Sequence, residues 1–343
     1  MLMCIAEKQS LSGIVFNAIE KLPEDQWPRQ DVLFEWVATA EQIKGQNILT
    51  TNVCKKLCDK FEEDGFESCI LKGQSNHAYY GEDLGNLRTC GDVDVWVVPK
   101  TKTAHPVKKV LDFLYGRNVV ESLCWLHAEV RPIKDVPIEI HLRPSFFNTP
   151  IRNRLFLSMF DFEKCVCKKT IDGVELPVLK TDYDIVFQMN HLYRHLLDEG
   201  VGMRQVLDYY MLLQAWNKEG TTTKEEMMES VEKLGMTRFA HALMYVLQKV
   251  FSMDASLLLC TPSEQYGKFL LNEILEAGNF GHYDARMKQL EVRKGELSYQ
   301  LQRTYRRIMR NLRFLTSYPS EVMWEPVARG SHFLWRKLGL WRF

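Results

Sequence analysis

Residues 92–98 read Asp-Val-Asp-Val-Trp-Val-Val, and this alternation of polar and apolar side chains predicts a β-strand with one buried face. Successive side chains of a strand point to opposite faces, so Asp92 and Asp94 share one face while the valines between and after them enter a core. Two residues of strand separate the Cα atoms of the two acids by roughly 6.6 Å. Both carboxylates can therefore reach one divalent ion, and the chain is expected to fold around a sheet that carries two acids on one face.

A second strand supplies a third acid. Residues 127–133 and 138–143 are expected to form a hairpin closed by residues 134–137, and the second strand reads Ile-Glu-Ile-His-Leu-Arg. Its alternation places Glu139, His141 and Arg143 on one face. If this strand lies in register beside residues 92–98, Glu139 joins Asp92 and Asp94. Three such carboxylates repel one another unless a cation lies between them, and hard oxygen ligands suit Mg²⁺ or Mn²⁺.

A glycine turn precedes this strand. Residues 67–72 form a short buried strand, followed by Gly73, Gln74 and Ser75 and by a helix from Ser75 to residue 80. Backbone N–H groups at such a strand–turn–helix junction bind phosphate, and Lys72 adds a positive charge. Arg88 comes just before the acid pair and can reach a phosphate oxygen, although a loop arginine is otherwise solvated. The turn alone is an ordinary loop, and its position is what suggests a nucleotide site.

The chain divides into three parts by pattern. Residues 1–66 are an N-terminal helical segment, residues 67–180 form an α/β core with a mixed sheet, and residues 181–343 form a C-terminal helical domain with a basic tail. Helices are expected at 105–115, 182–216, 224–234, 237–251, 264–277 and 290–314. The fold class is therefore α+β.

Two pairs of residues in the C-terminal part have helical i,i+4 spacing. His191 and His195 share one helix face, and Arg204 and Asp208 share another. These faces either close the cleft over nucleotide or acceptor, or pack against other helices with an Arg–Asp salt bridge. A zinc site on the histidine pair has no obvious third ligand.

The C-terminal tail combines arginines with aromatic residues. This composition suits a membrane surface, a polyanionic acceptor or a docking partner, and also a solvated arginine face with its aromatics packed inward. The basic residues are Arg303, Arg306, Arg307, Arg310, Arg313, Arg329, Arg336, Lys337 and Arg342.

Composition limits the function classes. The 343 residues are 46% hydrophobic and 26% charged, as in ordinary soluble proteins, and the net charge of zero does not favour nucleic acid as a partner. No apolar run is long enough to span a bilayer. The nine cysteines are an odd number without metal-site spacing, which indicates reduced, mostly buried thiols and a cytoplasmic protein.

Taken in order, several motifs resemble the uncharacterised nucleotidyltransferase family of bacteria, within the DNA-polymerase-β-like superfamily. They are Ile70-Leu-Lys-Gly73, Tyr79-Tyr80, Leu87-Arg88, Gly91-Asp-Val-Asp-Val95, Ile138-Glu-Ile-His141, His191-Leu-Tyr-Arg-His195, Met203-Arg204, Leu207-Asp208 and Ala277-Gly-Asn-Phe-Gly281.

The resemblance implies transfer of a nucleoside monophosphate from an NTP to an acceptor hydroxyl on a small molecule, sugar or protein, with Mg²⁺ or Mn²⁺. Asp92 and Asp94 would be the metal ligands and catalytic acids, with Glu139 as the third acid, which could help to deprotonate the acceptor. Gly73 and Ser75 would hold the triphosphate. Gln74 departs from the superfamily, in which many members have Gly-Ser or Gly-Gly at this turn.

Two alternatives stay open at this point. Gln74 motivates a non-catalytic nucleotide-binding or regulatory protein with the same fold, which would bind NTP without transferring it. A toxin or antitoxin-type nucleotidyltransferase acting on RNA or protein is the other, and growth arrest on expression would reveal it.

Overall fold

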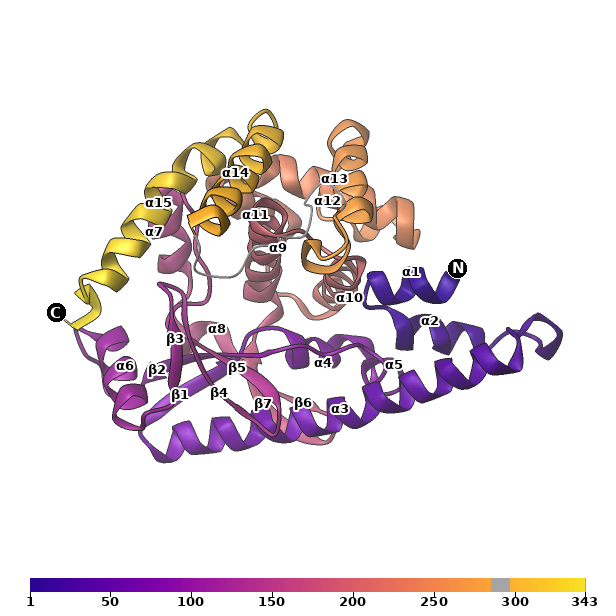
Figure 1. The fold of residues 1–343 in the computed structure, drawn as a ribbon, viewed down its shortest axis with the longest axis horizontal. Helices are drawn as coiled ribbons and strands as arrows, with labels where there is room; N and C mark the ends of the chain where they lie inside the picture. The colour runs from indigo at the N-terminus through magenta and orange to yellow at the C-terminus, as the bar shows by residue number, and fades with distance from the viewer. Residues whose placement is uncertain (285–296, 343) are drawn as a thin grey trace.

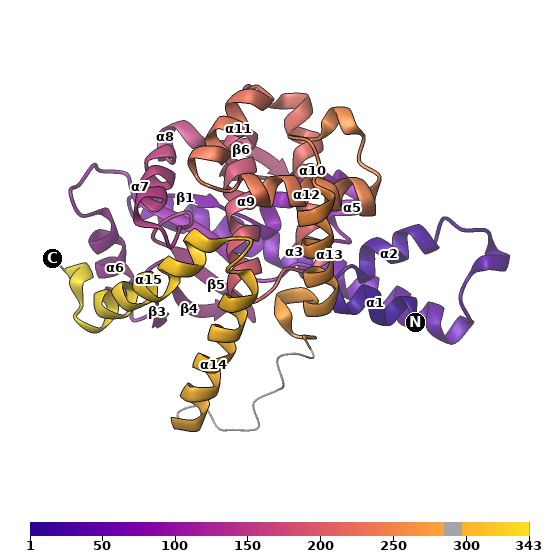
Figure 2. The same cartoon turned by 90° about the horizontal axis from the view of Figure 1, so that it is seen from above.

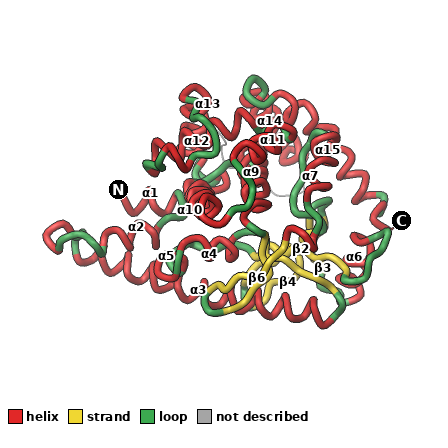
Figure 3. The backbone as a smooth tube through the Cα atoms, turned by 180° about the vertical axis from the view of Figure 1, so that it is seen from behind, coloured by secondary structure: helices red, strands yellow, loops and turns green. Residues whose placement is uncertain are grey.

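The computed structural model describes residues 1–284 and 297–342 of the chain. In these residues a seven-stranded mixed sheet lies between the long helix α3 (Gln30–Glu63) on one side and the C-terminal helices on the other (Figure 1, Figure 3). This combination of mixed sheet and helices confirms the α+β class expected from the sequence.

The sheet has the strand order β3-β4-β5-β2-β1-β7-β6. Strand β2 runs parallel to β5, and β1 runs parallel to β7, whereas the other neighbouring strands are antiparallel. The acid-bearing strands β2 and β5 are therefore direct neighbours inside the sheet. The strands are β1 (Phe66–Ile70), β2 (Val93–Pro99), β3 (Val120–Leu123), β4 (His127–Ile133), β5 (Val136–His141), β6 (Val166–Ile171) and β7 (Val174–Leu179).

One face of the sheet packs on α3 and α6 (Pro106–Gly116) through a continuous apolar core. Val93, Val95, Ile138 and Ile140 are all at most 2% exposed and belong to this core. Because side chains alternate along a strand, the residues between them point to the opposite face. Burial of these apolar side chains on one face of the sheet thus places the acids of β2 and β5 on the opposite face.

The opposite face is covered by helices that come after β5 in the chain, through a second and larger core. In Figure 2, seen from above, α14 extends beyond the other helices of this layer. Among the described residues, no helix combines the length and apolar character needed to span a bilayer. The helices are α7 (Pro150–Met159), α8 (Phe162–Cys165), α9 (Thr181–Asp198), α10 (Met203–Glu219), α11 (Lys224–Lys233), α12 (Thr237–Phe251), α13 (Glu264–Ala277), α14 (Leu297–Phe314) and α15 (Pro319–Lys337).

The N-terminal helices join the two layers. Helices α1 (Leu2–Lys8) and α2 (Ser12–Ile19) pack beside the start of α3, where the rings of Phe16 and Trp36 stack. Gln9, just after α1, accepts a hydrogen bond of 2.8 Å from the backbone N–H of Met203 through its side-chain oxygen. Its amide donates to the carbonyl oxygen of Ile274 at 3.5 Å. One side chain thereby connects the N-terminus to α10 and α13.

Four helices have the bounds that periodicity predicts to within one residue: α6, α11, α12 and α13. The expected helix over 182–216 is instead two helices, separated at Gly200 and Gly202. Gly200 has φ +132°, and the backbone of Gly281 lies within 2.9 Å of where its Cβ would be. The break therefore exists because residues 277–281 pack directly against the turn.

Several elements differ from the expectation. Strands β3, β6 and β7 and helix α15 were not expected, and the N-terminal helical pattern is interrupted at residues 20–29. The first part of the helix expected over 290–314 lies outside the described residues. All nine cysteines are free, but only four of them are buried. The division of the chain at residues 66 and 180 stays a prediction.

Candidate active site

The three expected acids lie together on the face of the sheet that is opposite to α3 and α6. Asp94 of β2 and Glu139 of β5 are direct register partners in the parallel pair, and Asp92 comes immediately before β2. One carboxylate oxygen from each of the three residues lies within 4.8 Å of the other two. The alternation predicted for both strands therefore brings Asp92, Asp94 and Glu139 to one point.

Lys72 lies against two of these acids. Its Nζ is 2.5 Å from Asp94 Oδ2 and 3.4 Å from Asp92 Oδ1. Burial lowers the pKa of Lys72, but the negative charges of Asp92 and Asp94 outweigh it and hold this pKa above its usual range. The same ammonium group lowers the pKa of Asp92, whereas burial and the charge of Asp92 raise the pKa of Asp94. Lys72 thus neutralises part of the charge of the acid group.

Two histidines complete the group. His141 Nε2 lies 2.8 Å from Asp94 Oδ1 and 3.5 Å from Glu139 Oε2, and His127 Nδ1 lies 3.0 Å from Glu139 Oε2. Burial opposes ionisation of Glu139, but its contacts with the two imidazoles lower its pKa well below the usual range. Burial likewise opposes protonation of His127, yet its partners Cys124 and Glu139 raise its pKa to about 10. Glu139 is accordingly a carboxylate at neutral pH.

Gly73 is required by the backbone that follows Lys72. It has φ +66°, and a Cβ at this position would lie 3.3 Å from the carbonyl oxygen of Asp92. Residues Gly73–Asn76 form a single 3₁₀ turn, and the helix expected from Ser75 begins at His77 as α4 (His77–Tyr80). The glycine therefore lets the chain pass directly beside the acid strand.

The side chains after Gly73 point away from the acids. Gln74 is buried, and its amide donates to Thr51 Oγ1 at 2.7 Å and to the carbonyl oxygen of Asn47 at 3.3 Å, both on α3. Ser75 is also buried, and among the described residues its hydroxyl has no hydrogen-bond partner. Neither side chain lines the two clefts described below, so any contact of these two residues with a nucleotide bound there would come from the backbone.

A narrow cleft of about 30 Å³, which we call the glycine cleft, opens on the β1 side of the acids. Arg88 and Asp208 both line it and form a buried bidentate ion pair, with N–O distances of 2.6 and 2.7 Å. Asp208 is thus paired with Arg88 on a distant segment, whereas an Arg204–Asp208 salt bridge was one expectation. Arg204 also lines the glycine cleft and donates to the carbonyl oxygen of Thr89 at 2.5 Å.

A wider cavity of about 220 Å³, which we call the acid cleft, contains Asp92, Asp94 and Glu139. His191 lies between the two clefts and lines both, and His195 lines the acid cleft alone. Their rings meet edge to face, with centroids 4.3 Å apart. Among the described residues, neither histidine belongs to a group of three potential metal ligands, so the structure provides no zinc site on this pair.

Sequence reasoning did not single out several residues that line these clefts. Among them are Asn76 in the glycine cleft and His127 and Arg194 in the acid cleft. His127 begins the strand β4 that pairs with the Glu139 strand. Arg194 is four residues before Asp198, which lines the same cleft, and lies 3.8 Å from it. The helical spacing was an available signal for Arg194, whereas the position of His127 depends on a hairpin register that is irregular.

Comparisons with known proteins identify the family of this chain. The sequence model of the family described as "Uncharacterised nucleotidyltransferase" matches residues 1–252. No curated protein sequence matches this chain. A crystal structure of an antigenic nucleotidyltransferase-like protein from Paracoccidioides brasiliensis is similar over 63% of this chain and 95% of that protein, with 11% identity and a TM-score of 0.36. Because the family match covers the glycine turn, the three acids and both clefts, this chain belongs to the uncharacterised nucleotidyltransferase family.

Proposed function

We propose that the protein transfers a nucleoside monophosphate from an NTP to the hydroxyl of an acceptor molecule. The observation that carries this proposal is the meeting of Asp92, Asp94 and Glu139 on one sheet face, beside a glycine turn and a cleft with three cationic side chains, Lys72, Arg88 and Arg204.

The donor set fits a divalent cation. All three acids offer hard oxygen ligands within 4.8 Å of one another. Asp94 Oδ2 is buried, and its partner is the ammonium of Lys72 at 2.5 Å, in the place where a cation would bind. Asp92, Asp94 and Glu139 would therefore hold Mg²⁺ or Mn²⁺. When bound, such an ion screens the charge of the reacting phosphates and orients them.

The triphosphate belongs in the glycine cleft. Lys72, Arg88 and Arg204 supply positive charge there, and the bare backbone at Gly73 permits close approach of a phosphate. The cleft is only about 30 Å³ in volume, so a triphosphate enters when side chains at its rim move apart. Lys72 is the side chain that would move, because a cation bound to the acids would replace the ammonium of Lys72, which could then contact the phosphates.

The acceptor hydroxyl belongs near Glu139. The hydroxyl oxygen of the acceptor forms a bond to the α-phosphorus. The bond between the α-phosphorus and the α,β-bridging oxygen breaks, and pyrophosphate leaves with that electron pair. Glu139 is ionised at neutral pH, because its contacts with His127 and His141 lower its pKa, and it can accept the hydroxyl proton. Because the Glu139 carboxylate is a weak base, its main role would be to orient the hydroxyl.

The test is transfer of label from each of the four α-³²P-labelled NTPs in the presence of Mg²⁺ or Mn²⁺ and cell extract. We expect one or more nucleotides to label an acceptor, and we expect Asp92→Asn combined with Asp94→Asn to abolish the transfer while circular dichroism shows an unchanged fold. Normal transfer by that double variant would overturn the proposal.

A second candidate is a nucleotide-binding protein without transferase activity. The contacts of Lys72 with Asp92 and Asp94 favour it, because a permanent ammonium at this place would exclude a metal ion. NTP binding by calorimetry, with neither transfer nor pyrophosphate release over a broad panel of acceptors, would select this candidate.

A further inference from the structure

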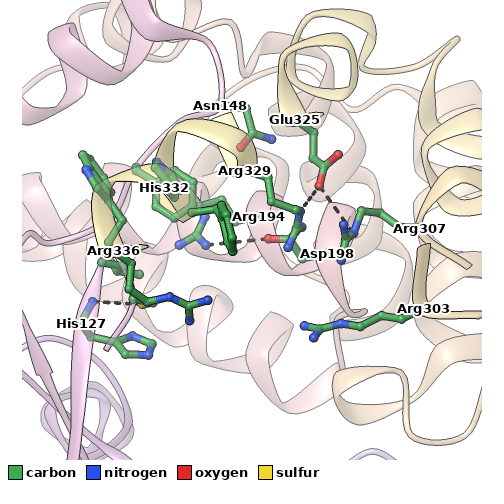
Figure 4. A pocket seen from close by; sticks show the side chains of 15 residues that line it. His127, Asn148, Arg194, Asp198, Arg303, Arg307, Glu325, Arg329, His332 and Arg336 are labelled. Carbon is green, nitrogen blue, oxygen red and sulfur yellow. Dashed lines mark hydrogen bonds and ion pairs between the residues drawn. The ribbon is translucent and has the colours of Figure 1, made fainter. Parts of the chain in front are cut away.

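An arginine-rich pocket adjoins the acid cleft. Its volume is about 450 Å³, and it lies between α9, α14, α15 and the turn from β3 to β4 (Figure 4). We call it the arginine pocket. It shares Leu126, His127, Arg194 and Asp198 with the acid cleft, so the two cavities meet beside Glu139.

Five arginines and only two acids line the arginine pocket. Asp198 lies among the arginines, and Glu325 lies at the edge of the group, toward Arg329 and Arg307 (Figure 4). The arginines come from three helices: Arg194 from α9, Arg303 and Arg307 from α14, and Arg329 and Arg336 from α15.

The two acids leave an excess of positive charge. Asp198 lies 3.8 Å from Arg194 and 3.6 Å from Arg329, and Glu325 contacts Arg329 and lies 3.7 Å from Arg307. Within the described ranges, Arg303 and Arg336 make no ion pair. Burial and the neighbouring charge of Arg329 lower the pKa of Arg307. Like charges gathered in one cavity destabilise the empty protein, and a bound anion removes that repulsion.

The end of the pocket near the sheet is aromatic. The ring of His332 stacks on Trp125 at 4.6 Å and meets Phe146 edge to face at 5.0 Å. Burial and the nearby arginines lower the pKa of His332 to about 4, so this imidazole is uncharged at neutral pH. The guanidinium of Arg194 lies over the ring of Phe146 at 3.7 Å, so the aromatic residues also hold an arginine of the pocket in place.

The position of the pocket relative to the acids assigns its role. The glycine cleft opens on the β1 side of the acids, and the arginine pocket lies beyond Glu139 and His127, on the β4 side. In an in-line displacement the attacking hydroxyl and the leaving pyrophosphate occupy opposite sides of the α-phosphorus. If the triphosphate lies in the glycine cleft, the acceptor approaches from the arginine pocket.

We propose that the arginine pocket binds the acceptor, and that this acceptor is a small molecule carrying a phosphate group as well as the hydroxyl that reacts. This inference rests on the proposed function. Guanidinium groups match phosphate oxygens in bidentate geometry, and a volume of about 450 Å³ suits a small molecule rather than a polymer.

The first experiment measures binding without catalysis. Calorimetry at low salt titrates inorganic phosphate into the full chain, with and without Mg²⁺ and the non-hydrolysable nucleotide α,β-methylene ATP. We expect phosphate to bind in both conditions, and Arg303→Gln with Arg336→Gln to weaken it at least tenfold. The matched control, Arg306→Gln with Lys337→Gln, removes the same charge from α14 and α15 outside the pocket and should change phosphate affinity less than twofold.

Affinity for the ATP analogue separates the two proposals. Neither double variant should change it by more than twofold. If the pocket variant weakens the analogue, or the analogue displaces phosphate, the pocket holds the triphosphate and the acceptor assignment is overturned. Absence of phosphate binding, or equal weakening by both double variants, also overturns it. If phosphate binds as expected but the analogue does not bind, the proposed function fails, and the acceptor assignment fails with it.

The second experiment identifies the acceptor class. Label from the NTP is transferred to the small-molecule fraction of an extract, with half of that fraction first treated with immobilised phosphatase, which is then removed. We expect a labelled small molecule that disappears after phosphatase treatment. Label that persists after the treatment, or that appears only in macromolecules, overturns the inference.

Discussion

Lys72 offers the sharpest test of the acid group, because it neutralises Asp92 and Asp94 from inside the protein. We predict that Lys72→Met, which removes the charge and shortens the unbranched side chain by one atom, destabilises the protein in EDTA. The Lys72 side chain is 15% exposed and that of Asp94 is fully buried, so the substitution leaves a buried carboxylate without its cation. Removal of one partner from such a pair costs about 3–5 kcal/mol.

The assay is thermal unfolding in EDTA and in excess Mg²⁺. A loss of about 3 kcal/mol lowers the Tm of a chain of 343 residues by roughly 4 °C. In Mg²⁺ the variant should recover most of this loss, because the ion takes over the neutralisation and binds only the folded state. The wild type should gain less from Mg²⁺, since the ion has to displace Lys72 first.

Two control variants separate charge from packing. Lys72→Arg keeps the positive charge and should lower the Tm in EDTA less than Lys72→Met does. Lys100→Met removes a lysine whose partner Glu62 is 3.4 Å away on the exposed surface, and it should change stability by less than about 0.5 kcal/mol. A Lys72→Met protein as stable as the wild type in EDTA, or a larger Mg²⁺ effect on the wild type, would refute the reasoning.

Three further predictions concern stability. Burial raises the pKa of Asp184 from 3.8 to about 7, so the folded state keeps a proton that the unfolded chain loses near pH 4, and ionisation destabilises the protein as the pH rises toward 7. Asp184→Asn should therefore raise the free energy of unfolding by up to about 4 kcal/mol at pH 8 and by little at pH 4. A gain in urea denaturation that does not depend on pH would contradict this. Gly73→Ala forces a side chain into φ +66° and should cost about 1–3 kcal/mol by urea denaturation, whereas the same change at exposed Gly116 should not. Arg88→Met leaves Asp208 buried without its cation and should cost about 3–5 kcal/mol, and Asp208→Leu added to it should restore part of the loss. Equal unfolding midpoints for the single and double variants would count against that pairing.

Local alternation was enough to predict which face of its strand each acid occupies. Asp92 and Asp94 face away from the core because the valines beside them must be buried, and Glu139 follows the same rule between Ile138 and Ile140. Both facts depend only on which side chains are apolar. The neighbouring position of the two strands came from the family resemblance and not from the pattern.

His127 could not be placed from the sequence because of an irregular hairpin. Ile133 pairs with Val136, and a regular ladder counted from that pair would set Val130 opposite Glu139 and move His127 to the wrong face. The register instead shifts by one residue between Val130 and Ile133, so Glu129 is opposite Glu139 and His127 is opposite His141. An irregularity of this kind leaves no clear mark in the sequence.

The turn after Gly73 shows a second limit. Gln74 and Ser75 occupy positions where phosphate contacts were expected, but both side chains are buried in a 3₁₀ turn, and Thr51 and Asn47 of α3 accept hydrogen bonds from Gln74. This burial depends on a helix more than twenty residues earlier in the chain. A local pattern contains no information about it.

The walls of the arginine pocket come from two separate stretches of the chain. Arg194 lies within the 252 residues that match the family, together with the acids and the glycine turn, whereas the other four arginines lie on α14 and α15, beyond that match. On the proposal above, the shared stretch would perform the chemistry and the C-terminal pair of helices would choose the substrate. Family members with a different C-terminus could then modify different compounds with one unchanged reaction centre, and exchange of α14 and α15 between two such enzymes would redirect their specificity.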